Sequence, residues 1–320
     1  MIFKKDISSL HVPHNKHTAA CVPVRIETPA EVILPMNMHS GHVAEPIVTV
    51  GEHVYVGQLI AREEGRFSSP VHASVSGTVS KIEPIPTANG GEVTAIYIES
   101  DGKMEADPNL KPPVFNGCEE FLQAVRESGV VGLGGAAFPA WAKLNEATNP
   151  DYKVDTVLIN AAECEPLIET DKFLMRTRAA DLVKGVDMIA KELGADKKYI
   201  ALKAAYKTEI AALEAAIAEA GSDIKLHKMG YFYPAGDEQV IVCEITGKSV
   251  PERGIPLMVG AVVDNVGTVL NIVDAFEGKP VTDKFLSVVG EVKHPVMLSV
   301  PLGTSVRACV EAACPTISNY

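Results

Sequence analysis

Three glycines within four residues, Gly132, Gly134 and Gly135, stand before Pro139 and a helical pattern at 140–144. Glycine permits positive φ and lets a ligand come close to the backbone, and proline suits the first turn of a helix. The free N–H groups of a helix N-terminus attract anions, so this stretch could cradle a phosphate group. A tight connection without a ligand explains the same residues, because neither a Walker motif nor a clean GxGxxG motif is present.

Two carboxylates, Glu163 and Glu165, follow the apolar, β-branched segment 154–159, which predicts a buried strand. In an extended loop, side chains two residues apart point to the same side. Carboxylates only accept hydrogen bonds, so the pair suits the hydroxyls of a ribose or a ribityl chain. Asn160 comes directly after the strand, where open α/β sheets bind ligands. A solvated acidic loop is the alternative.

Helical and strand patterns alternate around these residues. We expect helices at 119–128, 179–193, 207–220 and 267–276, and strands at 154–159, 198–203, 224–228 and 258–263. A further helix is expected to begin at 236–239, with Asp237 as its N-terminal cap, and to end near Gly247. This rhythm predicts a parallel or mixed sheet covered by helices.

The segment from 35 to about 100 alternates apolar and polar residues between turn glycines, which predicts β-structure. Its halves, 46–60 and 69–79, resemble the barrel-sandwich hybrid fold of biotinyl and lipoyl carriers. A carrier needs a modifiable lysine, and none lies between Glu45 and Ser80, so we expect a structural module. The proline-containing stretch 101–115 predicts a linker.

The last forty residues predict a hairpin and a helix, at 285–289, 297–300 and 304–314. Thr304 is the expected helix cap. One helical face is expected to be apolar and to need a partner surface: Val306, Cys309, Val310 and Ala313. Because a two-stranded sheet with one helix is marginal alone, we expect the chain to be part of a longer protein.

Composition limits the function classes. A chain of 320 residues can hold two or three domains. The net charge of −12 argues against nucleic acid or an anionic membrane surface as a major partner. No apolar run approaches the roughly 20 residues of a membrane-spanning helix, and the first residues lack the apolar core of a signal peptide. A cytoplasmic location is the expectation.

Metal sites are not expected in this sequence. The six cysteines are scattered without a CxxC pair, which favours buried thiols over disulfides, zinc or clusters. Three histidines recur at three-residue spacing, but Pro13 and the surrounding residues favour a loop: His11, His14 and His17.

Four motifs, in this order, resemble the RnfC family: 132–139 with 143–144, 159–166, 233–239 and 264–268. This family contains the C subunit of the Rnf NADH–ferredoxin oxidoreductase and a proline-reductase-associated relative, and it is similar to the flavin-binding subunit of complex I. The resemblance implies an α/β protein of three parts. They are a lead-in with a barrel-sandwich hybrid domain (1–105), a Rossmann-like FMN- and NADH-binding domain (115–280) and a partial β-grasp (281–320).

The resemblance implies FMN as cofactor and NADH as substrate, with hydride transfer by the cofactor and no catalytic side chain. The residues it assigns to FMN are Gly132, Gly134, Gly135, Ala136, Lys143, Asn160, Glu163, Gly236, Asp237, Glu238, Asp264 and Asn265. Lys143 would counter the phosphate charge. Phe138 would stack on the nicotinamide, and Glu165 would bond its ribose.

The family's two [4Fe–4S] clusters belong to cysteine motifs that would lie beyond position 320. Electrons would then pass out of this chain to other subunits of a complex or to a soluble reductase, with the protein peripheral on the inner face of the cell membrane. Three residues stand where the family usually has glycine: Ala137, Ala161 and Asp237. They would reduce or abolish flavin or NADH affinity, so a flavin-free assembly subunit that docks partners is the alternative.

Overall fold

The computed structural model describes residues 16, 18, 21–230 and 232–313. The chain divides into two compact units. The parallel-sheet unit comprises Met1–Ala19 and Ala147–Val266, and the barrel unit comprises Ala20–Glu146 and Gly267–Tyr320. The three histidines of the lead-in and Cys314 lie outside the described residues.

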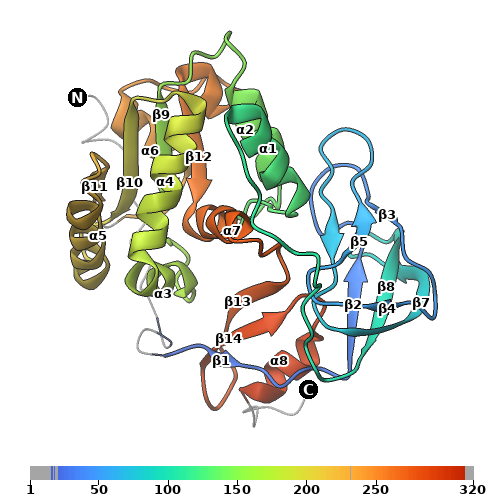
Figure 1. Cartoon of the computed structure of the whole chain (residues 1–320). Helices are drawn as coiled ribbons and strands as arrows, with labels where there is room; N and C mark the ends of the chain where they lie inside the picture. The colour runs from blue at the N-terminus through green and yellow to red at the C-terminus, as the bar shows by residue number, and fades with distance from the viewer. Residues whose placement is uncertain (1–15, 17, 19–20, 231, 314–320) are drawn as a thin grey trace. The chain divides into compact units, whose positions relative to one another are not determined.

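The parallel-sheet unit is built on four strands, labelled in Figure 1: β9 (Thr156–Asn160), β10 (Lys197–Lys203), β11 (Lys225–Met229) and β12 (Ala261–Asn265). All neighbouring pairs are parallel, in the order β11-β10-β9-β12. The chain therefore moves from β9 outward to β11 and then returns to the other side of β9. The strand order reverses between β9 and β12, which is the point where such sheets bind ligands.

Helices cover this sheet: α3 (Thr170–Thr177), α4 (Ala179–Leu193), α5 (Lys207–Ala220), α6 (Glu238–Thr246) and the 3-10 turn η1 (Pro256–Val259). Leu158 of β9 shares a core cluster with Ile241 and Val242 of α6. Because strand side chains alternate, Val157 and Ile159 face the opposite side, and α4 also packs on β9. The bounds of α4 and α5 agree with the prediction, and each helix ends at a left-handed glycine.

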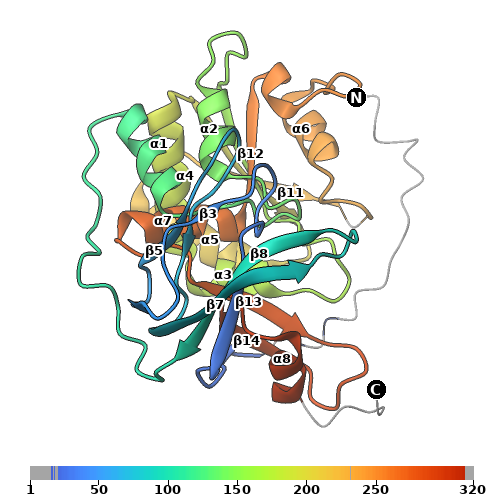
Figure 2. The ribbon, with the colours of Figure 1, turned by 90° about the vertical axis from the view of Figure 1, so that its right-hand side faces the viewer.

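The barrel unit contains a β-sandwich of two antiparallel sheets. One holds β2 (Glu31–Pro35), β8 (Glu92–Ser100), β7 (Gly77–Pro86) and β4 (His53–Val54), and the other holds β3 (Glu45–Pro46), β5 (Leu59–Arg62) and β6 (Val71–His72). Figure 2 shows β7 and β8 as the long pair. One buried cluster, which includes Val32, Leu34, Ile60 and Ile96, forms its core. The barrel-sandwich prediction is confirmed.

The remaining helices outside the C-terminal segment are α1 (Cys118–Glu127), α2 (Ala140–Ala147) and α7 (Val266–Phe276). Phe121 of α1 and Phe276 of α7 stack with ring centroids 5.2 Å apart, and Phe115 packs against both. Among the described residues, no helix combines the length and the apolar character needed to cross a membrane.

The C-terminal hairpin is confirmed as β13 (Asp283–Val288) paired antiparallel with β14 (Val296–Pro301). The expectation that this sheet has only two strands is wrong, because β1 (Val24–Arg25) adds a third strand, parallel to β14. Pairing between segments this far apart in the chain leaves no local signal.

The last helix, α8 (Val306–Ala312), is shorter than expected. Its cap is Ser305, whose Oγ accepts from Ala308 N at 3.2 Å, whereas Thr304 donates to the Pro301 carbonyl at 2.7 Å. Cys309 and Ala313 pack in the hairpin core. Val306 does not, since it is 79% exposed, so its predicted burial is wrong.

Two further elements differ from the prediction. The expected strand at 258–263 begins only at Ala261, because Pro256 starts a 3-10 turn and Gly260 ends it with a left-handed φ. Helix α3 was not predicted. It has only eight residues, which is too short for a clear helical period.

Candidate functional site

The reversal point between β9 and β12 brings two sequence motifs together. Asn160 and Asn265, the last residues of the two strands, are register partners, as are Ile159 and Asp264. Asp264 is 3% exposed. The predicted site residues from two motifs about a hundred positions apart therefore lie side by side at the carboxyl edge of the sheet.

Asn160 also binds the motif at 233–239. Its side-chain Nδ2 donates to the Gly236 carbonyl at 2.8 Å. Its Oδ1 accepts from Ala162 N at 3.2 Å. The asparagine thus fixes the start of the acidic loop, residues 161–169 between β9 and α3, against the turn before α6.

Packing favours glycine at position 236. A Cβ at this position would lie 2.8 Å from Cys164 Sγ and 3.6 Å from Ala162 Cβ. The next two residues, Asp237 and Glu238, are exposed. Asp237 caps α6 as predicted, since its Oδ1 accepts from Gln239 N at 3.0 Å and from Val240 N at 3.1 Å.

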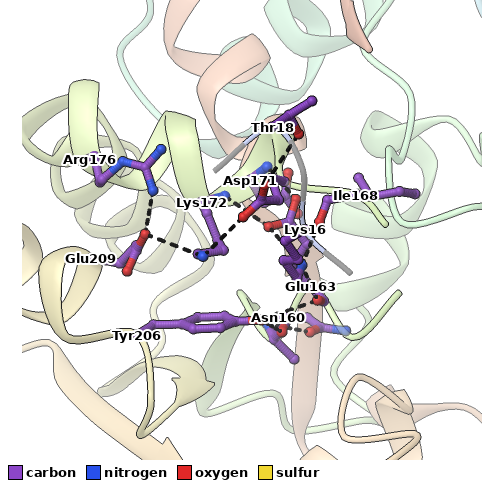
Figure 3. A network of polar contacts seen from close by, with 12 residues as sticks. Lys16, Thr18, Asn160, Glu163, Ile168, Asp171, Lys172, Arg176, Tyr206 and Glu209 are labelled. Carbon is purple, nitrogen blue, oxygen red and sulfur yellow. Dashed lines mark hydrogen bonds and ion pairs between the residues drawn. The ribbon is translucent and has the colours of Figure 1, made fainter. Parts of the chain in front are cut away.

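Glu163 is buried inside a polar network (Figure 3), and its side chain is 4% exposed. Its Oε1 accepts from Asp171 N at 2.7 Å and its Oε2 from Lys172 N at 3.2 Å. Both donors belong to the first turn of α3, where the helix dipole favours negative charge. Glu163 has a φ of +36°, so the backbone turns sharply here.

Lys16, from the lead-in, is the cation beside Glu163. Its Nζ lies 3.8 Å from Glu163 Oε2 and donates to the carbonyls of Glu163 at 3.3 Å and Ile168 at 2.5 Å. Burial, with the nearby Asp171 carboxylate second, raises the pKa of Glu163 to about 8, against the opposing effect of Lys16. Burial also lowers the pKa of Lys16.

The network continues along α3 (Figure 3). Buried Glu169 accepts from Thr18 Oγ1 at 3.2 Å and from Lys172 Nζ at 3.2 Å. Arg176 donates to Glu209 of α5 at 2.5 Å. Glu169 is thereby bonded to α3 and to the lead-in, and α3 is in turn paired with α5.

Three residues of this region were not identified from the sequence. Asp171 accepts from Asn265 Nδ2 at 2.6 Å. Tyr206 Oη donates to the carbonyls of Ala162 at 3.1 Å and Glu163 at 3.3 Å. Lys203 ends β10 and is 1% exposed, and burial lowers its pKa to about 8. Lys203 could have been noticed in the sequence, because it is a lysine at the end of a largely apolar predicted strand.

Glu165 is exposed, unlike Glu163. Its Oε1 lies 3.5 Å from Tyr233 Oη, the outer limit of a hydrogen bond. The two carboxylates of the acidic pair therefore have different surroundings: one is held by backbone N–H groups and the other faces solvent.

The glycine loop, defined as residues 132–139, is a closed turn in the barrel unit. Gly132 N donates to the Phe138 carbonyl at 2.8 Å, and Val131 and Pro139 form an isolated bridge. Leu133 N donates to Thr268 Oγ1 of α7 at 2.9 Å. The loop runs directly into α2, as predicted, and α2 carries the half-exposed Lys143.

The tip of the loop is exposed at Gly134, Gly135 and Ala136. Gly135 has a φ of +131° and Ala137 a φ of +48°. An alanine in this left-handed region is strained, which explains why glycine is the more suitable residue at position 137. The Phe138 ring is half-buried and lies 5.3 Å from the Phe67 ring.

The predicted site residues thus form two sets. The parallel-sheet unit holds Asn160, Glu163, Glu165, Gly236, Asp237, Glu238, Asp264 and Asn265, and the barrel unit holds Gly132, Gly134, Gly135, Ala136, Phe138 and Lys143. The first set is assembled from three motifs, whereas the second comes from the single motif 132–139 with 143–144. Among the described residues there is no group of three or more His, Cys, Asp or Glu side chains that could hold a metal ion.

Two family models match parts of this chain. Residues 6–103 match the family described as the RnfC barrel sandwich hybrid domain, and residues 125–274 match the Nuo51 FMN-binding domain. The chain is 37% identical over 313 residues to the C subunit of the Na(+)-translocating ferredoxin:NAD(+) oxidoreductase complex of Acetobacterium woodii. That alignment covers 94% of this chain and 69% of the relative. The chain belongs to the RnfC family.

A second RnfC relative is the C subunit of the proton-translocating ferredoxin:NAD(+) oxidoreductase complex of Clostridium ljungdahlii. It is 35% identical, with 97% of this chain and 68% of the relative covered. Among solved structures, an NAD+-reducing [NiFe]-hydrogenase in the H2-reduced state is similar, with a TM-score of 0.54 and 25% identity. That match covers 63% of this chain and 40% of the hydrogenase chain.

Proposed function

We propose that this RnfC chain binds FMN, accepts hydride from NADH on that flavin, and passes electrons to iron–sulfur clusters outside residues 1–320. The observation that supports this most is the register of Asn160 with Asn265 at the reversal point of the sheet. These residues lie within the segment that matches an FMN-binding domain. Two amide side chains at this edge suit a cofactor rich in hydroxyl and carbonyl groups.

The glycine loop suits a flavin phosphate. The exposed tip at Gly134 and Gly135 leaves backbone N–H groups accessible, and the loop leads into the N-terminus of α2. Lys143 is on the first turns of that helix and would oppose the phosphate charge. In this proposal Gly132 and Ala136 complete the loop that approaches the phosphate and ribityl chain.

The carboxyl edge of the sheet suits the ribityl chain and ring. Asn160, Asp264 and Asn265 would bond the flavin there. Glu163 already accepts two backbone N–H groups, and the oxygen lone pairs that remain would accept a ribityl hydroxyl. Gly236, followed by Asp237 and Glu238, would face the flavin.

NADH would bind beside the flavin. Phe138 offers an aromatic face to the nicotinamide, and the exposed Glu165 offers an acceptor to a ribose hydroxyl. Bound FMN supplies the hydride-accepting chemistry. The protein would orient the flavin and the nicotinamide, and the buried Glu163 side chain would keep the acidic loop in one conformation.

The onward path of the electrons requires partners. The two RnfC relatives are named as subunits of ion-translocating ferredoxin:NAD(+) oxidoreductase complexes. We propose that this chain likewise works with other subunits, or with a soluble reductase, and reaches the inner face of the cell membrane only through them. We also propose the division into 1–105, 115–280 and 281–320 as its functional parts.

An NADH:ferricyanide reductase assay tests the proposed function. Protein incubated with FMN and freed of excess flavin should reduce ferricyanide with NADH, and the rate should saturate with NADH concentration. Protein treated identically without FMN is the control. Equal rates with and without FMN would refute the proposal.

A further inference from the structure

Lys16 is a buried lysine of the lead-in that reaches the acidic loop (Figure 3), and its side chain is 8% exposed. Its Nζ donates to the Glu163 carbonyl at 3.3 Å and to the Ile168 carbonyl at 2.5 Å. These carbonyls stand at the two ends of the segment 163–168. A single amine therefore closes that segment.

Charge adds to these two hydrogen bonds. An ammonium group has three N–H donors, so it can serve several acceptors at once. Glu163 Oε2 lies 3.8 Å from Lys16 Nζ, and the Glu163 side chain is only 4% exposed. A buried ion pair is screened less by solvent than a surface pair. Lys16 thus holds the segment through its backbone and through its charge.

Glu165 lies between the two carbonyls that Lys16 joins. Its carboxylate is exposed, and its contact with Tyr233 Oη at 3.5 Å is at the outer limit of a hydrogen bond. Among the described residues, no backbone–backbone hydrogen bond holds the stretch 164–168. The conformation of Glu165 therefore depends on how the ends of the segment are held.

Two other contacts act on this segment. Tyr206 Oη donates to the Glu163 carbonyl at 3.3 Å, and the Glu163 carboxylate accepts from the first turn of α3. Both of them act through Glu163. Of the contacts described here, the one with Lys16 holds the Ile168 end as well.

A closed segment matters for binding because fixing a backbone costs conformational entropy. If the segment were open, NADH would have to order it on binding, and its affinity would fall accordingly. If Lys16 closes the segment beforehand, Glu165 is already in place when the nucleotide arrives.

We propose, on the basis of the proposed role of Glu165, that Lys16 is a positioning residue for NADH, which holds the segment 163–168 closed so that Glu165 can accept from the ribose. The lead-in is then part of the nucleotide site, although Lys16 lies 147 positions from Glu163 in the sequence. Lys16 itself does not contact NADH in this proposal.

The test compares Glu163→Gln with the double variant Lys16→Met, Glu163→Gln. Removing Lys16 alone would leave a buried carboxylate without its cation and could prevent folding. Both variants carry the same change at Glu163, so any effect of that carboxylate on FMN is common to both. We expect the KM for NADH in ferricyanide reduction, with FMN saturating, to be about five- to thirtyfold higher in the double variant. This is the effect of ordering one further backbone residue on binding. The kcat should be equal, because bound NADH meets the same flavin.

A second measurement needs no ligand. The ¹⁵N order parameter of the Glu165 amide should be near about 0.85 in Glu163→Gln and below about 0.6 in the double variant. Thr18→Val is the matched control, since it removes another lead-in hydrogen bond, to Glu169 Oε2, without touching the segment 163–168. It should leave the KM for NADH unchanged.

The outcomes separate this role from the proposed function. Parent protein that does not oxidise NADH with FMN would refute the proposed function, and the role of Lys16 in NADH binding with it. An active parent with equal KM values for the two variants would overturn the role of Lys16 alone. A lower kcat at equal KM, an unchanged order parameter of Glu165, or an equal rise of KM in Thr18→Val would also overturn it.

Discussion

Replacing Gly236 with alanine should disturb the point where two motifs meet. The added Cβ would lie 2.8 Å from Cys164 Sγ, well inside normal contact distance. Either Cys164 must rotate or the backbone must move, and the Gly236 carbonyl that accepts from Asn160 would move with it. Overpacking of this kind costs about 1–3 kcal/mol. We expect that loss of stability, together with weaker FMN binding.

A double-mutant cycle isolates the contact. Once Cys164→Ala removes Sγ, the nearest atom of residue 164 is Cβ, at an ordinary 3.5 Å. In the Cys164→Ala background, Gly236→Ala should therefore leave the free energy of unfolding almost unchanged. The difference between the two backgrounds gives a coupling energy of about 1–3 kcal/mol. Gly230→Ala is the control, because its nearest neighbour would lie 3.8 Å away and its φ is not left-handed.

Amide hydrogen exchange of β9 is the assay, because Asn160 ends that strand. The free energy of opening should fall for Gly236→Ala and recover in the double variant. Gly230→Ala should stay within about 0.5 kcal/mol of the parent. Additive effects of Gly236→Ala and Cys164→Ala, or an effect of Gly236→Ala no larger than that of the control, would refute the reasoning.

Three further substitutions test other parts of the site. Thr268→Val removes the acceptor of Leu133 N, so it should lower the free energy of unfolding by about 1–2 kcal/mol and weaken FMN binding. Thr268→Ser keeps the hydroxyl and should do neither. Equal effects of the two variants in a flavin titration would contradict this. Glu165→Gln should raise the KM for NADH about ten- to a hundredfold without releasing FMN; loss of flavin at unchanged KM would show that the roles are reversed. The raised pKa of Glu163 means that the folded protein binds its proton more tightly, so this group's contribution to stability declines as the pH rises from about 4.5 through about 8. Glu163→Gln should remove that decline in urea unfolding measured across this range, and an unchanged pH dependence would argue against it.

Local patterns were sufficient to predict much of the sheet and its helices. The bounds of α4 follow from its helical periodicity and those of α5 from its alanine-rich composition, and both helices end at glycines that adopt left-handed φ. The motif residues at the carboxyl ends of β9 and β12 could be expected to meet, because parallel strands end at the same edge of a sheet. The pairing of Asn160 with Asn265 agrees with this.

Long-range contacts could not be predicted in the same way. Lys16 and Glu163 lie 147 positions apart, and no periodic pattern connects them. The sequence showed a carboxylate pair, but only the fold shows that the Glu163 side chain is buried and bonded to the first turn of α3, while Glu165 is exposed. β1 likewise finds β14 only through tertiary structure, because two residues are too few to reveal a partner.

The most direct test of the central claim is a fluorescence titration of FMN with the purified chain. We expect flavin fluorescence to be quenched as protein is added, to saturate at one FMN per chain, and to be weakened by Gly236→Ala. The far-UV spectrum of the same sample establishes that the protein is folded. Folded protein that leaves flavin fluorescence unchanged at tens of micromolar would contradict the proposed function and would favour a flavin-free docking subunit.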